Sequence, residues 1–185
     1  MSLPDKYTKP AVILHWLIAI GIIFNLGMML IVGDDDRNRA FYDLHKSVGL
    51  VVLGFALMRL LWRFSHKPPA LPTTYKPWES KLSHAAHFAL YGLMIAMPLS
   101  GWLHDSAWKD AASHPLTIFG VIPWFRLLPF TTMDLASKEH WHGIFGFWHA
   151  IILTYVLYAV LLAHIAGALK HQFLDKEKEL QRMWF

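Results

Sequence analysis

The sequence predicts an all-α fold: an integral membrane four-helix bundle, built as one domain from residues 1–185. Two observations carry this prediction. Apolar residues make up 55% of the chain and the mean hydropathy is +0.34, which is more apolar than an ordinary soluble domain. The apolar residues also gather in four stretches of about twenty residues or more, the length a helix needs to cross a bilayer.

The four predicted spans are separated by polar or proline-rich loops. They cover residues 11–32, 45–64, 82–103 and 142–171. Pro10 precedes the first span, where a helix start tolerates proline. The stretch 118–130 is apolar and aromatic but interrupted by prolines, so we expect it to lie at the membrane interface rather than to span.

Composition excludes several classes of protein. The chain has no cysteine, which excludes disulfides, zinc ribbons, thiolate-bound clusters and covalent c-type haem. Its net charge is +4, and basic residues of a membrane protein usually belong to cytoplasmic loops, so no nucleic-acid partner is expected. The N-terminus has no signal-peptide cleavage pattern, and the first apolar run is expected to remain as a span.

The distribution of lysine and arginine predicts that both termini lie in the cytoplasm. Eleven of these residues fall at the N-terminus, around the second loop and in the tail, against six around the first and third loops. An excess of positive charge marks the cytoplasmic side. The first and third loops then face outside.

Four histidines inside the spans form two pairs at matching depths. His15 and His164 lie toward the cytoplasmic side, and His45 and His149 toward the outer side. His149 and His164 are fifteen residues apart, which is about 22 Å along a helix and about 60° around it. One helix therefore presents an imidazole near each membrane face. A histidine in lipid is expensive and normally faces the bundle interior with a partner.

Two pairs of neutral imidazoles in a dry bundle suit two b-type haems, because iron porphyrin accepts two axial nitrogens. Zinc or copper would need a third or fourth ligand at each depth, and no cysteine or well-placed carboxylate supplies one. The predicted iron ligands are His15 with His164 and His45 with His149. Interior histidines without a ligand role are the alternative, but these have no reason to match in depth.

Two further histidines compete for the cytoplasmic-side haem. His84 and His87 lie at a depth near that of His15. As structural residues they would hydrogen-bond a haem propionate or a carbonyl group. As ligands they would replace His15 as the partner of His164. We favour the first interpretation.

Four stretches of the chain, in the same order, resemble the bacterial di-haem cytochrome b561 family, which is related to the cytochrome b subunits of membrane formate dehydrogenases and hydrogenases. They are AVILHWL around His15, DLHKSVGLVVLGFALMRLLWR from Asp43, PWESKLSHAAHFALYGLMIAMPLSGWL from Pro77, and HIAGALKHQF from His164, followed by LQRM. The resemblance covers nearly the whole chain. It implies a four-helix bundle with two b haems in the bacterial inner membrane, and by position it places the axial ligands on the same four histidines.

One spacing departs from the resembled pattern. The family usually has one residue fewer between the two ligands of its fourth helix than the fourteen that separate His149 from His164. A local helix bulge would absorb the extra residue. Alternatively, His142 would replace His149, but it would lie about 33 Å from His164, further than two haems in one hydrocarbon core need.

The resemblance implies transmembrane electron transfer that involves the quinone pool. We expect an oxidoreductase that moves electrons between a periplasmic-side donor, with superoxide as one candidate, and ubiquinone. The alternative is a haem-containing membrane anchor that passes electrons between the quinol pool and a separate redox protein. A haem-carrying or metal-transport protein without redox turnover ranks last, because transporters usually show repeated halves and broken helices.

Four residues at the cytoplasmic side receive expected roles in this reaction. Quinone reduction needs protons, and His171, beside Lys170 about two turns beyond His164, is the candidate catalytic group. A solvated histidine at a helix end is the alternative. Arg59 and Arg63 are candidates to bind haem propionates, because a guanidinium group binds a carboxylate bidentately. Both are equally explained as ordinary cytoplasmic-side charges.

Use of superoxide predicts a basic funnel at the outer mouth, because positive potential steers a small anion. Arg37, Arg39 and Lys46 lie near His45 and would form it, although the outer loops carry six basic and eight acidic residues, a net −2. The expected partners are the lipid bilayer, quinone, and either superoxide or a periplasmic redox protein. A homodimer is left open.

Overall fold

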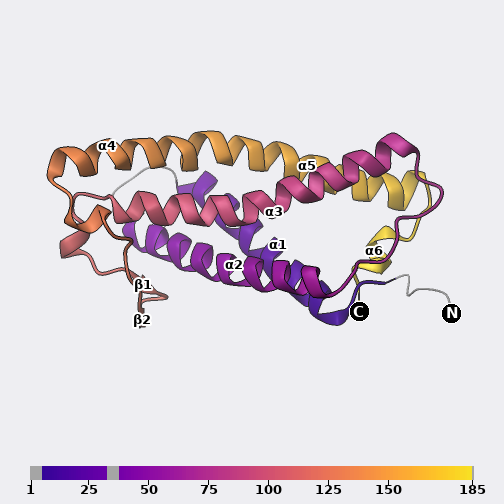
Figure 1. Cartoon of the computed structure of the whole chain (residues 1–185), viewed down its shortest axis with the longest axis horizontal. Helices are drawn as coiled ribbons and strands as arrows, with labels where there is room; N and C mark the ends of the chain where they lie inside the picture. The colour runs from indigo at the N-terminus through magenta and orange to yellow at the C-terminus, as the bar shows by residue number, and fades with distance from the viewer. Residues whose placement is uncertain (1–5, 33–37, 185) are drawn as a thin grey trace.

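The computed structural model describes residues 6–32 and 38–184. Four long helices run side by side along one axis (Figure 1). They are α1 (Lys9–Val32), α2 (Arg39–Ser65), α3 (Pro77–Ser106) and a composite fourth helix (Leu135–Leu174). Each is long and apolar enough to cross a membrane. The predicted four-helix architecture is confirmed, and each helix extends beyond the span expected from hydropathy.

The fourth helix contains two π-helical turns. It consists of α4 (Leu135–Gly146), the π-turn η4 (Phe147–Leu153), α5 (Thr154–Leu169) and the π-turn η5 (Lys170–Leu174). A π-turn adds a residue without breaking the helix. Within η4, the His149 carbonyl accepts a hydrogen bond from Thr154 Oγ1 at 2.7 Å. The helix bulge that the spacing of His149 and His164 allowed is therefore present, at His149 itself.

The first three helices share a small apolar core. Ile18 of α1, Val52 and Ala56 of α2, and Met94 of α3 form its buried centre. A Cβ atom on Gly21 would lie 2.5 Å from Val52 Cγ2, so only glycine lets α1 and α2 approach this closely.

Short elements between α3 and α4 cover one end of the bundle, here called the hairpin end. They are η2 (Ala111–Ser113), β1 (Thr117–Ile118), β2 (Ile122–Pro123) and η3 (Phe130–Thr132). The two strands pair antiparallel and project beside α2 (Figure 1). Ser47 of α2 anchors them, because its hydroxyl accepts a hydrogen bond from the Phe119 amide at 2.9 Å. The stretch 118–130 forms no spanning helix, as expected, and its place at the membrane interface stays a prediction.

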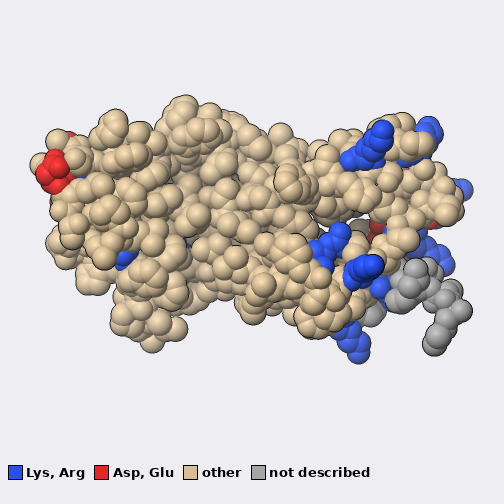
Figure 2. Space-filling model, in the orientation of Figure 1, with Lys and Arg blue, Asp and Glu red and all other residues tan. Residues whose placement is uncertain are grey.

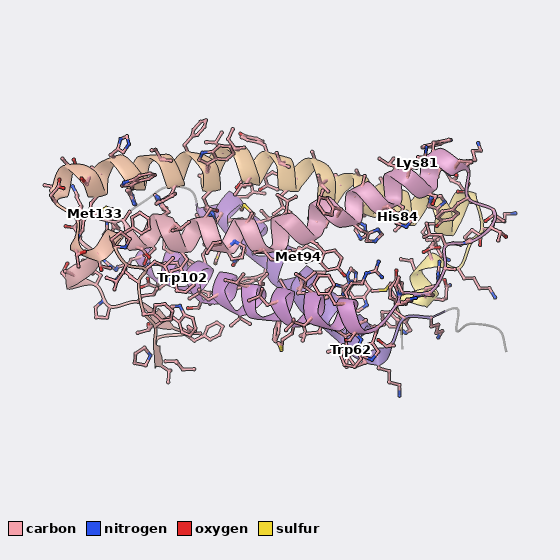
Figure 3. The ribbon with its side chains drawn as sticks, in the orientation of Figure 1. Trp62, Lys81, His84, Met94, Trp102 and Met133 are labelled. Carbon is pink, nitrogen blue, oxygen red and sulfur yellow. The ribbon has the colours of Figure 1, made fainter. Side chains whose placement is uncertain are left out.

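Both termini lie at the opposite end, here called the terminal end (Figure 1). The short helix α6 (Glu179–Arg182) is tied there, since Trp16 Nε1 donates to the Met183 carbonyl at 2.8 Å. Lys and Arg side chains gather at this end on the face shown in Figure 2. Trp62 lies toward it and Trp102 toward the hairpin end (Figure 3), as in the aromatic belts of membrane proteins.

A buried ion network holds the hairpin end. Asp105 of α3 pairs with Arg126 Nε at 2.8 Å and with Lys46 Nζ of α2 at 3.2 Å. The side chains of Asp105 and Arg126 are only 10% and 9% exposed. A charge buried this deeply is stable only with a close counter-charge, so the network joins two helices and the loop after α3.

Asp105→Asn is expected to lower the free energy of unfolding by about 3 kcal/mol, because it leaves the Arg126 charge buried without a counter-charge. Equilibrium unfolding in detergent, followed by circular dichroism, measures the loss. The control is Asp43→Asn, which removes the more exposed partner of Lys46 at 2.8 Å and is expected to cost less than about 1 kcal/mol. Equal losses in the two variants would contradict the argument from burial.

Candidate functional site

One histidine pair lies toward the hairpin end, between α2 and the π-turn η4. The ring centroids of His45 and His149 are 6.0 Å apart, with their planes at 85°. His149 Nδ1 donates to the Met97 carbonyl at 3.0 Å, which orients the ring and leaves Nε2 available to a ligand. His45 Nδ1 is buried with no hydrogen-bond partner among the described residues. A buried ring nitrogen without a partner is costly and fits a group that a bound cofactor would contact.

The position of His149 depends on a glycine in α3. A Cβ atom on Gly101 would lie 2.9 Å from His149 Cε1. Any larger residue would therefore push the imidazole away from α3 and from its bond to Met97. The position of the His149 ring therefore depends on Gly101 of α3 as well as on the π-turn η4.

The other pair lies toward the terminal end. His15 of α1 and His164 of α5 have ring centroids 6.3 Å apart, at an interplanar angle of 69°. His87 of α3 also approaches His164, with centroids 5.4 Å apart. The four predicted ligands are half-buried, whereas His84 and His87 are exposed. His87 Nδ1 donates to the Ser83 carbonyl at 2.7 Å, which is one of the two structural roles expected for it.

The two pairs fit a metal held between two imidazoles. An imidazole nitrogen binds a first-row metal at about 2 Å, so two rings on opposite sides of one ion have centroids about 6 Å apart. The observed 6.0 and 6.3 Å match this value, and 5.4 Å for His87 with His164 is shorter. Neither pair belongs to a group of three candidate ligands among the described residues. Two axial nitrogens without a third protein ligand suit haem, because its porphyrin supplies the other four.

The alternative outer ligand, His142, makes a different contact. It stacks on His104 of α3 with centroids 3.7 Å apart. Each Nδ1 of this pair donates to the other residue's carbonyl at 2.9 Å. His142 therefore joins α4 to α3, while His149 faces His45.

Basic residues surround a cavity at the terminal end. The cavity has a volume of about 300 Å³, and among the described residues four cations and no carboxylate line it: Lys6, Arg59, Arg63 and Lys67. Arg59 Nη1 donates to the Ala11 carbonyl at 2.8 Å, four residues before His15. The structure thus brings both predicted arginines to a space that suits acidic groups.

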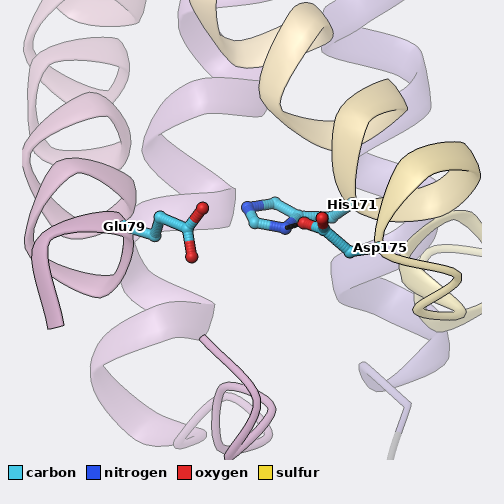
Figure 4. Close-up of side chains that lie close together, drawn as sticks. All are labelled: Glu79, His171 and Asp175. Atoms are coloured by element: carbon cyan, nitrogen blue, oxygen red, sulfur yellow. Dashed lines mark hydrogen bonds and ion pairs between the residues drawn. The ribbon is translucent and has the colours of Figure 1, made fainter. Parts of the chain in front are cut away.

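A charged cluster lies at the rim of the terminal end (Figure 4). Lys170 Nζ lies 2.8 Å from Glu79 Oε1 and 2.6 Å from Asp175 Oδ2. His171 Nδ1 donates to Asp175 Oδ2 at 2.6 Å, and Tyr75 stacks on the imidazole with centroids 4.0 Å apart. Sequence reasoning found His171 and Lys170 but missed their partners. Only Asp175, four residues after His171, carried a local signal.

The expected basic funnel at the hairpin end is only partly visible. Arg37 lies outside the described residues. The guanidinium of Arg39 lies 5.3 Å from the centre of the Trp108 ring. Lys46 is paired with Asp43 at 2.8 Å and with Asp105 at 3.2 Å, so its charge is locally compensated. Lys46 is therefore a poor element of an anion funnel, because its field is cancelled by these two carboxylates.

Comparison with known proteins gives a consistent result. Residues 6–185 match the sequence model of a family described as "Prokaryotic cytochrome b561". The chain is 31% identical to "Cytochrome b561 homolog 2" of Escherichia coli (strain K12), over 97% of this chain and 92% of that protein. It is 22% identical to "Cytochrome b561 homolog 1" of the same organism, over 97% of each chain. It is also 24% identical to "Probable superoxide oxidase CybB" of Yersinia pestis, over 96% of this chain and 95% of that protein.

Acid is expected to loosen the charged cluster. The hydrogen bond from Lys170 holds the pKa of the Asp175 carboxyl below its ordinary value of 3.8. The pairing therefore stabilises the fold above that ordinary value and is lost as the pH falls through the lowered one. Hydrogen exchange of residues 170–182, corrected for intrinsic rates, should show less protection at pH 3 than at pH 6. Asp175→Asn should show the weaker protection already at pH 6, and a full pH response in this variant would contradict the assignment.

Proposed function

The chain belongs to the prokaryotic cytochrome b561 family, and from this premise we propose that it carries electrons across the bacterial inner membrane between an outer donor and ubiquinone. The family accounts for membrane electron transfer with haem b. The proposal adds two haems per chain, ubiquinone as a substrate, and cytoplasmic termini.

The observation that carries the proposal is the presence of two imidazole pairs with the same spacing. Their centroid distances are 6.0 and 6.3 Å, and the fourth helix contributes one ring to each pair, about 22 Å apart along its axis. Two such sites span much of a hydrocarbon core of about 30 Å. Haem bound at each level would supply one-electron redox chemistry.

The protein's own residues would hold and tune this cofactor. His45 with His149, and His15 with His164, would bind the iron. The hydrogen bond from His149 to Met97 would fix the orientation of the imidazole and leave Nε2 for the iron, as outer partners of metal-bound histidines do.

Acidic groups on the haem at the terminal end would meet the basic cavity beside it. Arg59 and Arg63 line this cavity, and we propose that they bind the propionates. The exposed His87, close to His164, would lie beside the same haem.

Ubiquinone would react at the terminal end, which we place in the cytoplasm. The concentration of lysine and arginine at this end (Figure 2) agrees with the positive-inside rule. His171 would relay a proton at Nε2, which would take it up from water and pass it to the reduced quinone, since Nδ1 donates to Asp175. Lys170 would support it by holding Asp175 in place at 2.6 Å.

The outer donor has two candidates. Superoxide is supported by the similarity to a relative named as a probable superoxide oxidase, at 24% identity. A separate periplasmic redox protein is favoured by the pairing of Lys46 with two carboxylates, because this pairing weakens the attraction for a small anion. In the second case the chain would be a haem-containing membrane anchor.

Histidine variants test the haem assignment. His15→Ala and His164→Ala should lose the same haem, while His45→Ala and His149→Ala should lose the other, because a missing axial ligand leaves that iron unheld. The haem content per chain and the reduced-minus-oxidised spectrum measure this, and the exposed His140→Ala is the control. Loss of a haem in His87→Ala together with its retention in His15→Ala would show that His87 is the ligand.

Stopped-flow kinetics distinguish the two donors. Superoxide is expected to reduce the purified protein, and ubiquinone to reoxidise it. Arg39→Gln should slow the first reaction roughly two- to fivefold, because one steering charge is lost, and should leave ubiquinol oxidation unchanged. Reduction by ubiquinol but not by superoxide would instead support the membrane anchor.

A further inference from the structure

We propose that Glu79, His171 and Asp175 bind a divalent transition-metal ion such as Zn²⁺ at the rim of the terminal end, in place of the Lys170 ammonium group. The proposal of metal binding does not depend on the proposed function. Its consequence, inhibition of quinone turnover, rests on the function proposed above for His171.

The three side chains already converge. One ligand atom from each lies within 4.8 Å of the other two, and Figure 4 shows them meeting between the start of α3 and the last turn of the fourth helix. Ligand atoms around a tetrahedral zinc ion are about 3.3 Å apart. Side-chain motion alone would bring the three ligand atoms from within 4.8 Å to this spacing. The Asp175 side chain is 37% exposed and therefore has room to move. Three protein ligands with a water as the fourth is a common zinc arrangement.

A cation already occupies the space between the carboxylates. Lys170 Nζ contacts Glu79 at 2.8 Å and Asp175 at 2.6 Å. The Glu79 side chain is only 7% exposed, and its Oε2 accepts the Lys76 amide at 2.9 Å. This carboxylate is therefore held in place independently of Lys170. Two carboxylates that face each other in this way repel unless a positive charge lies between them.

The charge balance favours a divalent ion over the ammonium group. Two carboxylates and one ammonium leave a net −1 when the imidazole is neutral, whereas two carboxylates and Zn²⁺ sum to zero. The Lys170 side chain is 39% exposed, so its flexible stem can carry the ammonium into water. The imidazole selects a borderline-soft ion, because Mg²⁺ prefers an all-oxygen shell.

An ordinary ion-pair network would respond differently to loss of the lysine. If Lys170 only stabilises the fold, Lys170→Gln weakens the cluster and binds no metal more tightly. If Lys170 competes with the metal, the same substitution removes the competitor and raises the affinity for Zn²⁺. The sign of this effect decides between the two.

The test is calorimetric titration of the haem-loaded protein in detergent with ZnCl₂, with MgCl₂ as the comparison ion. Glu79→Gln and Asp175→Asn should each weaken Zn²⁺ binding by about tenfold or more, and Lys170→Gln should strengthen it. Glu177→Gln is the matched control, since this carboxylate lies in the same tail but accepts a hydrogen bond from Thr74 at 2.6 Å outside the cluster. The haem spectrum of each variant verifies that it is folded.

Unchanged Zn²⁺ affinity in Glu79→Gln and Asp175→Asn would overturn the site, as would weaker binding in Lys170→Gln. Ubiquinone turnover is measured in the same samples. Binding with the expected pattern of variants but without inhibition would support the metal site and contradict the proton-transfer role of His171. The two proposals therefore fail separately.

Discussion

The arrangement of this bundle depends on one constraint: an imidazole inside a membrane needs a partner. A polar ring facing hydrocarbon is unstable, and in this bundle the four half-buried histidines face each other from different helices, at 6.0 and 6.3 Å. Each pair draws one ring from the fourth helix. That helix runs antiparallel to α1 and parallel to α2 (Figure 1). Its position along the bundle therefore sets both levels at once, and any shift along its axis would disturb both pairs.

The π-turn at His149 is the local consequence of this constraint. The chain has one residue more between the two rings of the fourth helix than the family pattern that it resembles, and the π-turn η4 lies at the first of these rings. Around the turn, the protein uses Gly101 to make room for the imidazole and the Met97 carbonyl to orient it. Such turns concentrate at functional sites, and this one includes His149.

The two ends of the bundle use charge in different ways. At the hairpin end, Asp105 neutralises Arg126 and shares Lys46, so buried charge serves the fold and little is left to attract an anion. At the terminal end, four cations line a cavity, and a separate cluster pairs Lys170 with Glu79 and Asp175. This asymmetry agrees with acidic cofactor groups and proton transfer on one side and electron entry on the other.

The sequence by itself determined the four helices, the position of each histidine along its helix and the end at which basic residues gather, because hydropathy, helical rise and charge distribution depend only on positions along the chain. It also left two explanations for the extra residue between His149 and His164: a local helix bulge, or His142 in place of His149. Only the tertiary structure showed the π-turn at His149 and brought His142 onto His104. Likewise, Glu79 meets Lys170 across 91 positions in the sequence, and Lys46 meets Asp105 across 59. Contacts between such distant segments follow from helix packing and leave no periodic pattern in the sequence.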